Sequence, residues 1–304
     1  MEYILTASGL NKKYRHSDAL NQLSIHIPKG SIYGFVGENG AGKTTFIRII
    51  CGLQKPTSGN YALYGVKSSE KAITKMRERI GAIVESPSIY PDMTAENNLK
   101  HQYHVLGLPS YDGISEILQL VGLSNTGKKR AKNFSLGMRQ RLGIAVALAG
   151  NPDFLILDEP TNGLDPQGII EMRELILRLN RERQITVLIS SHNLDELSRL
   201  ATHYGFIAKG SMVKELTAEE LERNCRKCMV LNVTDTEVLA RALDFMNLEY
   251  DIISDTEANV YEEIPVSELS LALAENGCRI LAMHEHNETL ESYYINLTGG
   301  GKYE

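Results

Sequence analysis

Residues 37–44 combine three glycines with a lysine and a threonine in the order GENGAGKT, which matches GxxxxGK[ST] in full. The segment SIYGFVG predicts a strand over 31–37, and TTFIRIICGL predicts a helix over 44–53. Glycines let backbone N–H groups turn inward around phosphate oxygens, and the N-terminus of a helix favours an anion. An ordinary glycine turn does not require both flanking elements. The pattern therefore predicts a cradle for the phosphates of a nucleoside triphosphate.

The side chains of this cradle suit the same ligand. We expect Lys43 to reach the β- and γ-phosphates and the Thr44 hydroxyl to coordinate Mg²⁺, while Thr45 adds a phosphate contact. Binding alone does not show what the triphosphate drives. The residues of the loop that we expect to bind the nucleotide are Gly37, Asn39, Gly40, Ala41, Gly42, Lys43, Thr44 and Thr45.

Two acids and a histidine end two further predicted strands. FLILDEP predicts a buried parallel strand that leads into Asp158 and Glu159, and ITVLISSH (185–192) predicts another that ends at His192. Asp158 can hold Mg²⁺ through water, and Glu159 can polarise the attacking water. Because the carboxyl ends of parallel strands converge on one crevice, His192 can contact the γ-phosphate. Taken alone, the acids could simply begin a helix and the histidine could be structural.

Two more segments place polar groups where a ligand could use them. The strand predicted near Gly81–Val84 runs directly into Glu85, and a carboxylate at the end of a buried strand is unfavourable without a cation. In NFSLGMRQ, Ser135 is a good helix N-cap and Gly137 bares the backbone, so the first amides of the helix could hold an anion. A plain capped amphipathic helix would explain Ser135 alone.

The elements that must position these residues alternate strand and helix. This rhythm predicts an α/β fold with a mainly parallel sheet, interrupted by a largely helical stretch from Ala95 to Gly150. The composition changes near Gly210–Thr217, and TLESYYINLTGG predicts a short helix near the end. Between them we predict an α+β domain with the ferredoxin-like order βαββαβ. Its elements are a strand over 229–234, a helix over 236–246, two strands within 248–263, a helix over 267–276 and a strand over 278–284.

Charge is distributed unevenly along the 304 residues, whose net charge is −6. Residues 217–304 hold 18 acids and six bases, so residues 1–216 carry a net charge of +6. A mildly basic first part suits an anionic ligand, and the acidic second part argues against nucleic acid as a partner. We find no apolar run of about 18 residues and no signal peptide, so we expect a cytoplasmic location.

Two short patterns could suggest a metal site. Cys225 and Cys228 form a lone CxxC, and HEH occupies residues 284–286. Neither is accompanied by further ligands at a typical spacing. Reduced thiols and a solvated strand end are therefore the favoured interpretations.

The ordered set of motifs resembles the nucleotide-binding subunit of an ABC transporter. GENGAGKTT resembles the Walker A motif, FSLGMRQ the LSGGQ signature, LILDEP the Walker B motif, GLD at 163–165 the D-loop and SSH the switch-histidine strand. The resemblance covers roughly residues 3–215. It implies a P-loop NTPase of the ABC type over residues 1–216, with a helical subdomain at about 90–150, followed by a small accessory domain over 217–304. Leu136 stands where the family usually has a glycine, but Ser135 and Gly137 remain.

The resemblance also implies a pair of copies that face each other head to tail. Each ATP would lie between the phosphate cradle of one copy and Ser135, Gly137 and Met138 of the other. Asp165 would link the two sites across the pair. Tyr14 falls where the family stacks an aromatic ring on adenine, although a tyrosine at a strand edge is the alternative.

Glu85 stands where the family usually has a glutamine that reaches Mg²⁺ and the attacking water. A carboxylate keeps the oxygen ligand and loses the amide donor. We therefore expect Glu85 to be a metal ligand whose cationic partner is present only when Mg-ATP is bound. A solvent-facing Glu85 is the alternative.

Several segments resemble one branch of the family, which exports bacitracin and lantibiotics or protects the cell from them. These segments are VESPSIYPDMTAENNL, FSLGMRQRLGIA and the ending LTGG. The branch implies an ATPase that uses ATP and Mg²⁺, works as a homodimer, and binds an integral membrane permease at the inner face of the cell membrane. The alternatives are an ATPase for another drug or ion exporter, an importer, or a soluble ABC ATPase.

Overall fold

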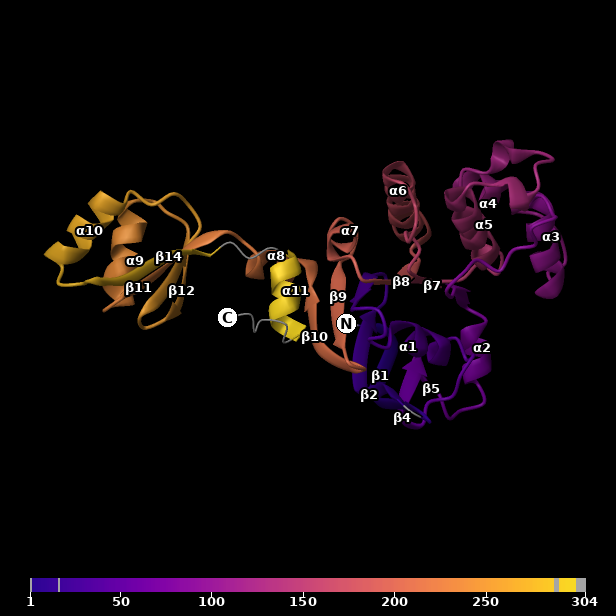
Figure 1. The fold of residues 1–304 in the computed structure, drawn as a ribbon, viewed down its shortest axis with the longest axis horizontal. Coiled ribbons are helices and arrows are strands. Elements are labelled where there is room, and N and C mark those ends of the chain that lie inside the picture. Colours follow the sequence, from indigo (N-terminus) through magenta and orange to yellow (C-terminus); the bar gives the residue numbers. More distant parts are fainter. Residues whose placement is uncertain (1, 16, 287–289, 299–304) are drawn as a thin grey trace. The chain divides into compact units, whose positions relative to one another are not determined.

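The structure is a computed structural model that describes residues 2–15, 17–286 and 290–298, apart from the side chains of residues 286 and 291 (Figure 1). Contacts between Cα atoms divide the chain into two compact units, Met1–Ala218 and Glu219–Glu304. Each unit has its own hydrophobic core. We describe the two units separately. No helix in the described ranges is long and apolar enough to cross a membrane.

A six-stranded sheet forms the centre of the first unit. Five of its strands are parallel, and β10 is antiparallel to β9. The parallel sheet predicted from the sequence is confirmed, and every residue of the strands β3, β7 and β8 is buried, as expected for a parallel sheet that is covered on both faces. The strands, in sheet order, are β10 (Ser211–Thr217), β9 (His203–Ala208), β3 (Ile32–Val36), β8 (Thr186–Ser191), β7 (Phe154–Asp158) and β6 (Ile80–Ile83).

Three helices follow strands of this sheet. α1 (Lys43–Ile50) follows β3, α6 (Pro166–Arg183) lies between β7 and β8, and α7 (Leu194–Ser198) follows β8. The helical stretch predicted over 95–150 is also present. It contains α3 (Ala95–Val105), α4 (Ile114–Leu120), the 3₁₀ turns Ser124–Thr126 and Ala131–Asn133, and α5 (Leu136–Leu148), and Figure 1 shows α3, α4 and α5 grouped together.

The sequence interpretation missed a second sheet in this unit. It is an antiparallel sheet with the order β2-β1-β4-β5. Its strands are β1 (Tyr3–Tyr14), β2 (Ser17–Pro28), β4 (Ser58–Leu63) and β5 (Val66–Lys67), and the short helix α2 (Ile73–Arg77) follows them.

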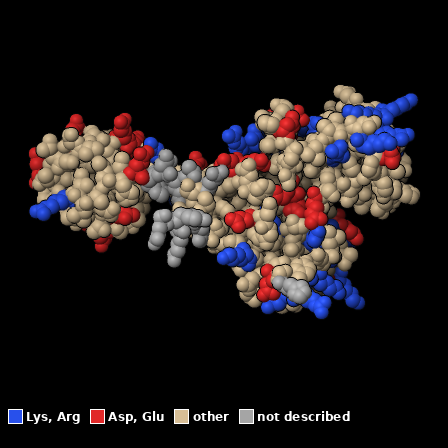
Figure 2. Space-filling model, in the orientation of Figure 1, with Lys and Arg blue, Asp and Glu red and all other residues tan. Residues whose placement is uncertain are grey.

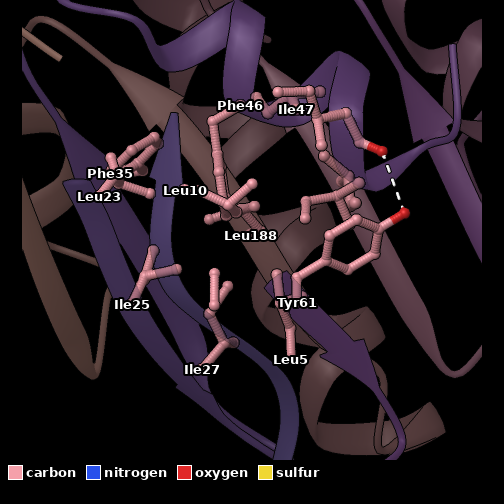
Figure 3. Packing of buried hydrophobic residues seen from close by; sticks show 14 of the residues in the cluster. Leu5, Leu10, Leu23, Ile25, Ile27, Phe35, Phe46, Ile47, Tyr61 and Leu188 are labelled. Carbon is pink, nitrogen blue, oxygen red and sulfur yellow. Dashed lines mark hydrogen bonds between the residues drawn. The ribbon is translucent and has the colours of Figure 1, made fainter. Parts of the chain in front are cut away.

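The main core lies between this sheet and the central one. Figure 3 shows part of one buried cluster that contains Leu5, Leu10 and Leu23 of the antiparallel sheet together with Phe46 of α1 and Leu188 of β8. All five side chains are almost fully buried. Because α1 is enclosed on both sides, its N-terminus is held firmly at the end of β3. This packing fixes the position of the residues that begin α1.

The second unit has the predicted ferredoxin-like order. Its elements are β11 (Cys228–Val233), α9 (Thr236–Phe245), β12 (Tyr250–Ser254), β13 (Glu257–Val260), α10 (Val266–Glu275) and β14 (Ile280–His286). The sheet order is β12-β13-β11-β14 with antiparallel neighbours, so β13 separates β11 from β12 as in a split βαβ unit. Leu231, Leu239 and Leu273 lie in its core.

Two helices flank this motif. α8 (Ala218–Asn224) precedes it and α11 (Leu290–Thr298) follows it, and Asn224 donates a hydrogen bond to the Tyr293 hydroxyl at 3.1 Å. Cys225 and Cys228 are reduced cysteines. The side chain of residue 286 in the HEH segment lies outside the described part of the chain.

Candidate functional site

Most of the predicted site residues lie at one edge of the central sheet. β3, β8, β7 and β6 are adjacent and parallel, so their carboxyl ends lie side by side. The glycine loop follows β3, His192 follows β8, Glu159 follows β7 and Glu85 lies two residues after β6. The topology thus brings together residues that are far apart in the sequence.

The glycine loop is pressed closely against the rest of the fold. Gly42 has φ +112°, and a Cβ there would lie 2.5 Å from the Ala19 carbonyl oxygen. A Cβ at Gly37 would lie 2.6 Å from Ile207 Cγ2. Only glycine fits at both positions. At Gly40, by contrast, no atom lies within 4 Å of a Cβ, so the middle of the loop is open.

Other positions of the loop differ in exposure. Asn39 is exposed, Ala41 is buried, and Thr45 is partly buried in the first turn of α1. The accessible middle of the loop and its buried ends suit a segment that wraps around a ligand with its backbone.

The Lys43 side chain is buried, and its ammonium group has both hydrogen-bond acceptors and an acidic partner. Its ammonium group donates to the carbonyl oxygens of Gly37 at 2.5 Å and Glu38 at 3.2 Å, and lies 3.2 Å from Glu159 Oε1. Only 5% of the side chain is exposed. A buried lysine needs such partners because burial disfavours its charge. These contacts hold the Lys43 ammonium group beside the backbone of the loop.

Asp158 connects the loop to two neighbouring strands. The Thr44 hydroxyl donates to Asp158 Oδ2 at 2.8 Å, and the Ser190 hydroxyl donates to Asp158 Oδ1 at 2.5 Å. Asp158 and Ser190 are direct partners in the parallel register of β7 and β8. Both carboxylate oxygens are therefore held by hydroxyl groups. The sequence interpretation missed Ser190, although it lies in the SSH segment that marked the strand.

Glu159 bridges a lysine and a histidine. One of its carboxylate oxygens contacts Lys43, and the other lies 2.7 Å from His192 Nδ1. Its backbone has φ +51°, in the left-handed region that is unusual for residues other than glycine. Its N–H is directed to Ser190, with Oγ at 3.0 Å and the carbonyl oxygen at 3.2 Å. The strained backbone directs the carboxylate between Lys43 and His192.

Glu85 has a different environment from the one predicted. Arg48 of α1 donates to Glu85 Oε1 at 2.6 Å. The expectation that Glu85 has a cationic partner only with Mg-ATP bound is therefore wrong, because α1 itself supplies one. This pair was not predicted from the sequence, because its members lie 37 positions apart. The Glu85 side chain remains 59% exposed.

Two helix starts carry the signature-like and D-loop-like residues. Ser135 caps α5 by accepting a hydrogen bond from Met138 N at 3.2 Å, and Asp165 caps α6 by accepting one from Gly168 N at 3.1 Å. The two starts are close, because a Cβ at Gly137 would lie 3.7 Å from Leu164 Cδ2.

Leu136, the departure from the family pattern, lies at the same place. A Cβ at Gly163 would lie 3.2 Å from Leu136 Cδ2. The leucine therefore packs toward the D-loop-like segment, and its side chain is partly exposed. Among the residues that the structure describes, no hydrogen bond or ion pair joins these helix starts to Lys43 or Glu159.

Tyr14 lies at the end of β1 with its ring accessible. Its hydroxyl donates to Gln54 Oε1 at 2.6 Å, and the Lys12 ammonium group lies 5.2 Å from the ring centre. Gln54 follows α1, so the ring is tied to the same helix that begins with Lys43. An exposed aromatic face held in this way can stack on a base.

The donor set fits ATP and Mg²⁺. Mg²⁺ prefers oxygen ligands and is commonly bound by one or two protein groups together with substrate phosphates. The Thr44 hydroxyl and the Asp158 carboxylate supply such oxygens next to the loop. Within the ranges that the structure describes, no group of three or more His, Cys, Asp or Glu residues could hold a metal.

Burial and charge also act on Cys51 at the end of α1. The pKa of the Cys51 thiol is raised to about 12, chiefly by burial, while Arg77 acts to lower it and the Asp158 carboxylate acts to raise it. The thiol is therefore neutral at physiological pH. Cys51 therefore has a structural role near the site and takes no part in its chemistry.

Comparison with known proteins agrees with this geometry. The family model described as "ABC transporter" matches residues 20–162. The chain is 41% identical to the bacitracin transport ATP-binding protein BcrA of Bacillus licheniformis over 304 residues, which is 99% of each chain. It is 44% identical to the lantibiotic transport ATP-binding protein SrtF of Streptococcus pyogenes over 212 residues, 70% of this chain and 90% of that one.

A solved structure shows the same fold. It is the dimeric structure of a bacterial ABC transporter cassette, with a TM-score of 0.63 and 25% sequence identity over 70% of this chain and 98% of that one. The phosphate cradle, the acids at the strand ends and the full-length likeness to a transport ATP-binding protein lead to one conclusion. This chain belongs to the ABC transporter family, as an ATP-binding subunit that hydrolyses ATP.

Proposed function

We propose that this chain hydrolyses ATP to drive the export of an antimicrobial peptide, such as bacitracin or a lantibiotic, or its removal from the membrane. The observation that carries the substrate class is the 41% identity to a bacitracin transport ATP-binding protein over 99% of both chains. That alignment includes the second unit, which the ATPase chemistry does not require. The identity to a lantibiotic transport ATP-binding protein supports the same class.

The proposal assigns a role to each part of the chain. Residues 1–216 form the nucleotide-binding domain, with its helical subdomain at about 90–150, and residues 217–304 form an accessory domain. The partners are a second copy of the chain and an integral membrane permease. The chain would then lie on the cytoplasmic face of the membrane, attached through that permease.

The loop and α1 bind the phosphates of ATP in this proposal. Backbone N–H groups from Gly40 to Thr45 surround the phosphates, and Lys43 exchanges its carbonyl contacts for the β- and γ-phosphate oxygens. Thr44 and Asp158 hold Mg²⁺, whose charge offsets that of the phosphates. Ser190 keeps the Asp158 carboxylate oriented toward Thr44.

Glu159 and His192 carry the hydrolytic step. Glu159 orients and polarises the attacking water, and His192 contacts the γ-phosphate. Their contact at 2.7 Å supports joint action, because each fixes the direction of the other. Glu85 approaches the metal side from the end of β6, and the Tyr14 ring stacks on adenine.

A second copy completes each site. Ser135, Gly137 and Met138 would bind the phosphates held by the partner's loop, because they lie at the N-terminus of α5 and the N-terminus of a helix favours an anion. Asp165 at the start of α6 would link the two sites. The dimeric solved cassette of the same fold supports this arrangement.

Two experiments test the proposal. Glu159→Gln should retain ATP binding, lose hydrolysis and accumulate an ATP-bound dimer, which size-exclusion chromatography would detect. Wild-type turnover by this variant would contradict its role. Expression of the chain with its co-encoded permease in a sensitive host should raise resistance to bacitracin or a lantibiotic. Absence of protection against every peptide tested would refute the substrate class and leave the ATPase intact.

A further inference from the structure

Arg48 and Glu85 form an ion pair beside the metal side of the phosphate cradle. Arg48 Nη2 lies 2.6 Å from Glu85 Oε1, and the arginine side chain is 34% exposed. Arg48 lies four residues after Thr44 in α1, so the two side chains lie on neighbouring turns of one helix face. The arginine that holds the carboxylate is thus attached to α1 about one helical turn after Thr44, whose hydroxyl would bind Mg²⁺.

The backbone around Glu85 leaves it little freedom. Glu85 has φ +62° and is the centre of a three-residue turn in which Ser86 N donates to the Val84 carbonyl oxygen at 2.7 Å. On the other side, Pro87 rests against α5, because a Cβ at Gly143 would lie 2.6 Å from Pro87 Cβ. The segment is held by the central sheet before Glu85 and by α5 after it.

We infer that Arg48 is a positioning residue that holds the Glu85 carboxylate away from Mg²⁺, so that Glu85 must release Arg48 before it can contact the metal. The inference rests on the proposed role of Glu85 at the metal side. A carboxylate oxygen engaged at 2.6 Å by a guanidinium group is poorly available to a second cation, and the two cations repel each other.

This device depends on an acid at position 85. A glutamine there would carry no charge to attract Arg48, and only its amide oxygen could accept a hydrogen bond from the guanidinium group. The exchange of partners is thus a property of this chain's Glu85–Arg48 combination. It links the metal side of the cradle to the segment that continues through Pro87 to α5.

The test measures the affinity of the full-length chain for AMP-PNP by calorimetry, once with Mg²⁺ and once with EDTA. The dissociation constant in EDTA divided by that in Mg²⁺ reports how much Mg²⁺ strengthens binding. Arg48→Gln should raise this ratio about threefold, the scale of an exposed ion pair, and leave the affinity in EDTA unchanged. Arg48→Lys should keep the wild-type ratio, because it retains the charge.

The same substitution in a Glu85→Gln background provides the control. There Arg48→Gln should leave the ratio unchanged. An equal effect in both backgrounds would overturn the inference, since Arg48 would then act on the nucleotide directly. An unchanged ratio in Arg48→Gln with Glu85 present would overturn it as well. If the wild-type chain did not bind AMP-PNP at all, the proposed function would fail as well. If the wild-type chain bound AMP-PNP but Arg48→Gln did not change the ratio, the inference would be refuted and the proposed function would stand.

Discussion

Replacement of Ser190 by alanine tests whether a buried hydroxyl orients the acid that faces Thr44. Ser190 is fully buried, and its hydroxyl donates to Asp158 Oδ1 at 2.5 Å. The Glu159 N–H also contacts that hydroxyl, but it keeps the Ser190 carbonyl oxygen at 3.2 Å as a partner. The substitution therefore leaves Asp158 as the group that loses a hydrogen-bond partner.

The size of the effect follows from that single lost bond. A hydrogen bond to a charged group contributes about 1.5–3 kcal/mol, so the free energy of unfolding should fall by about that amount. If the transition state for hydrolysis loses the same stabilisation, kcat falls by about 10- to 150-fold, at about 1.36 kcal/mol for each factor of ten. The KM for ATP should change much less, because Lys43 and the backbone of the loop keep their contacts.

Steady-state phosphate release and denaturant unfolding would measure both quantities. Ser191→Ala is the matched control, because Ser191 is the next residue of the same strand and its hydroxyl accepts from Asn193 N at 2.9 Å instead of contacting Asp158. That variant should keep nearly the wild-type kcat. An Ser190→Ala protein with wild-type turnover, or an equal loss in both variants, would refute the reasoning.

Further predictions concern the support of the site. Because burial raises the pKa of Cys51 to about 12, iodoacetamide should label it at pH 8 about a thousandfold more slowly in the native than in the unfolded protein, and the native rate should keep rising with pH up to about 12; peptide mapping by mass spectrometry would show this. Gly143→Ala should lower Tm despite its better helix propensity, because its Cβ would lie 2.6 Å from Pro87 Cβ; an unchanged or higher Tm would contradict the contact. Tyr14→Ala should weaken ATP binding by about 1–3 kcal/mol, the scale of base stacking, and Gln54→Ala should weaken it less; equal affinities in fluorescence titrations would argue against the adenine site.

Elements with strong local signals were predictable from the sequence. α6 carries such signals, because Asp165 caps its start and Pro166 is favoured in the first turn. β7 and β8 were recognised as continuous apolar runs. The glycine loop was recognised because its spacing and both flanking elements agree.

Elements shaped by long-range pairing were not predictable. β1 and β2 pair with several register shifts, which break the alternation that marks a strand, and residues such as Lys12 and Lys13 make β1 look like a loop. The contacts of Ser190 with Asp158 and of Arg48 with Glu85 depend on strand register and on the packing of α1. Such contacts exist only after the chain has folded, so spacing in the sequence does not report them.

The left-handed backbone at Glu85 has a consequence for how this position changes under selection. A φ of +62° costs a residue other than glycine about 1 kcal/mol or more, and an exposed ion pair returns about 1 kcal/mol or less. Selection for folding stability alone would therefore not retain an acid at position 85. A mutant library selected for expression should drift toward glycine or asparagine at position 85, whereas a library selected for survival in the presence of the peptide should keep the glutamate.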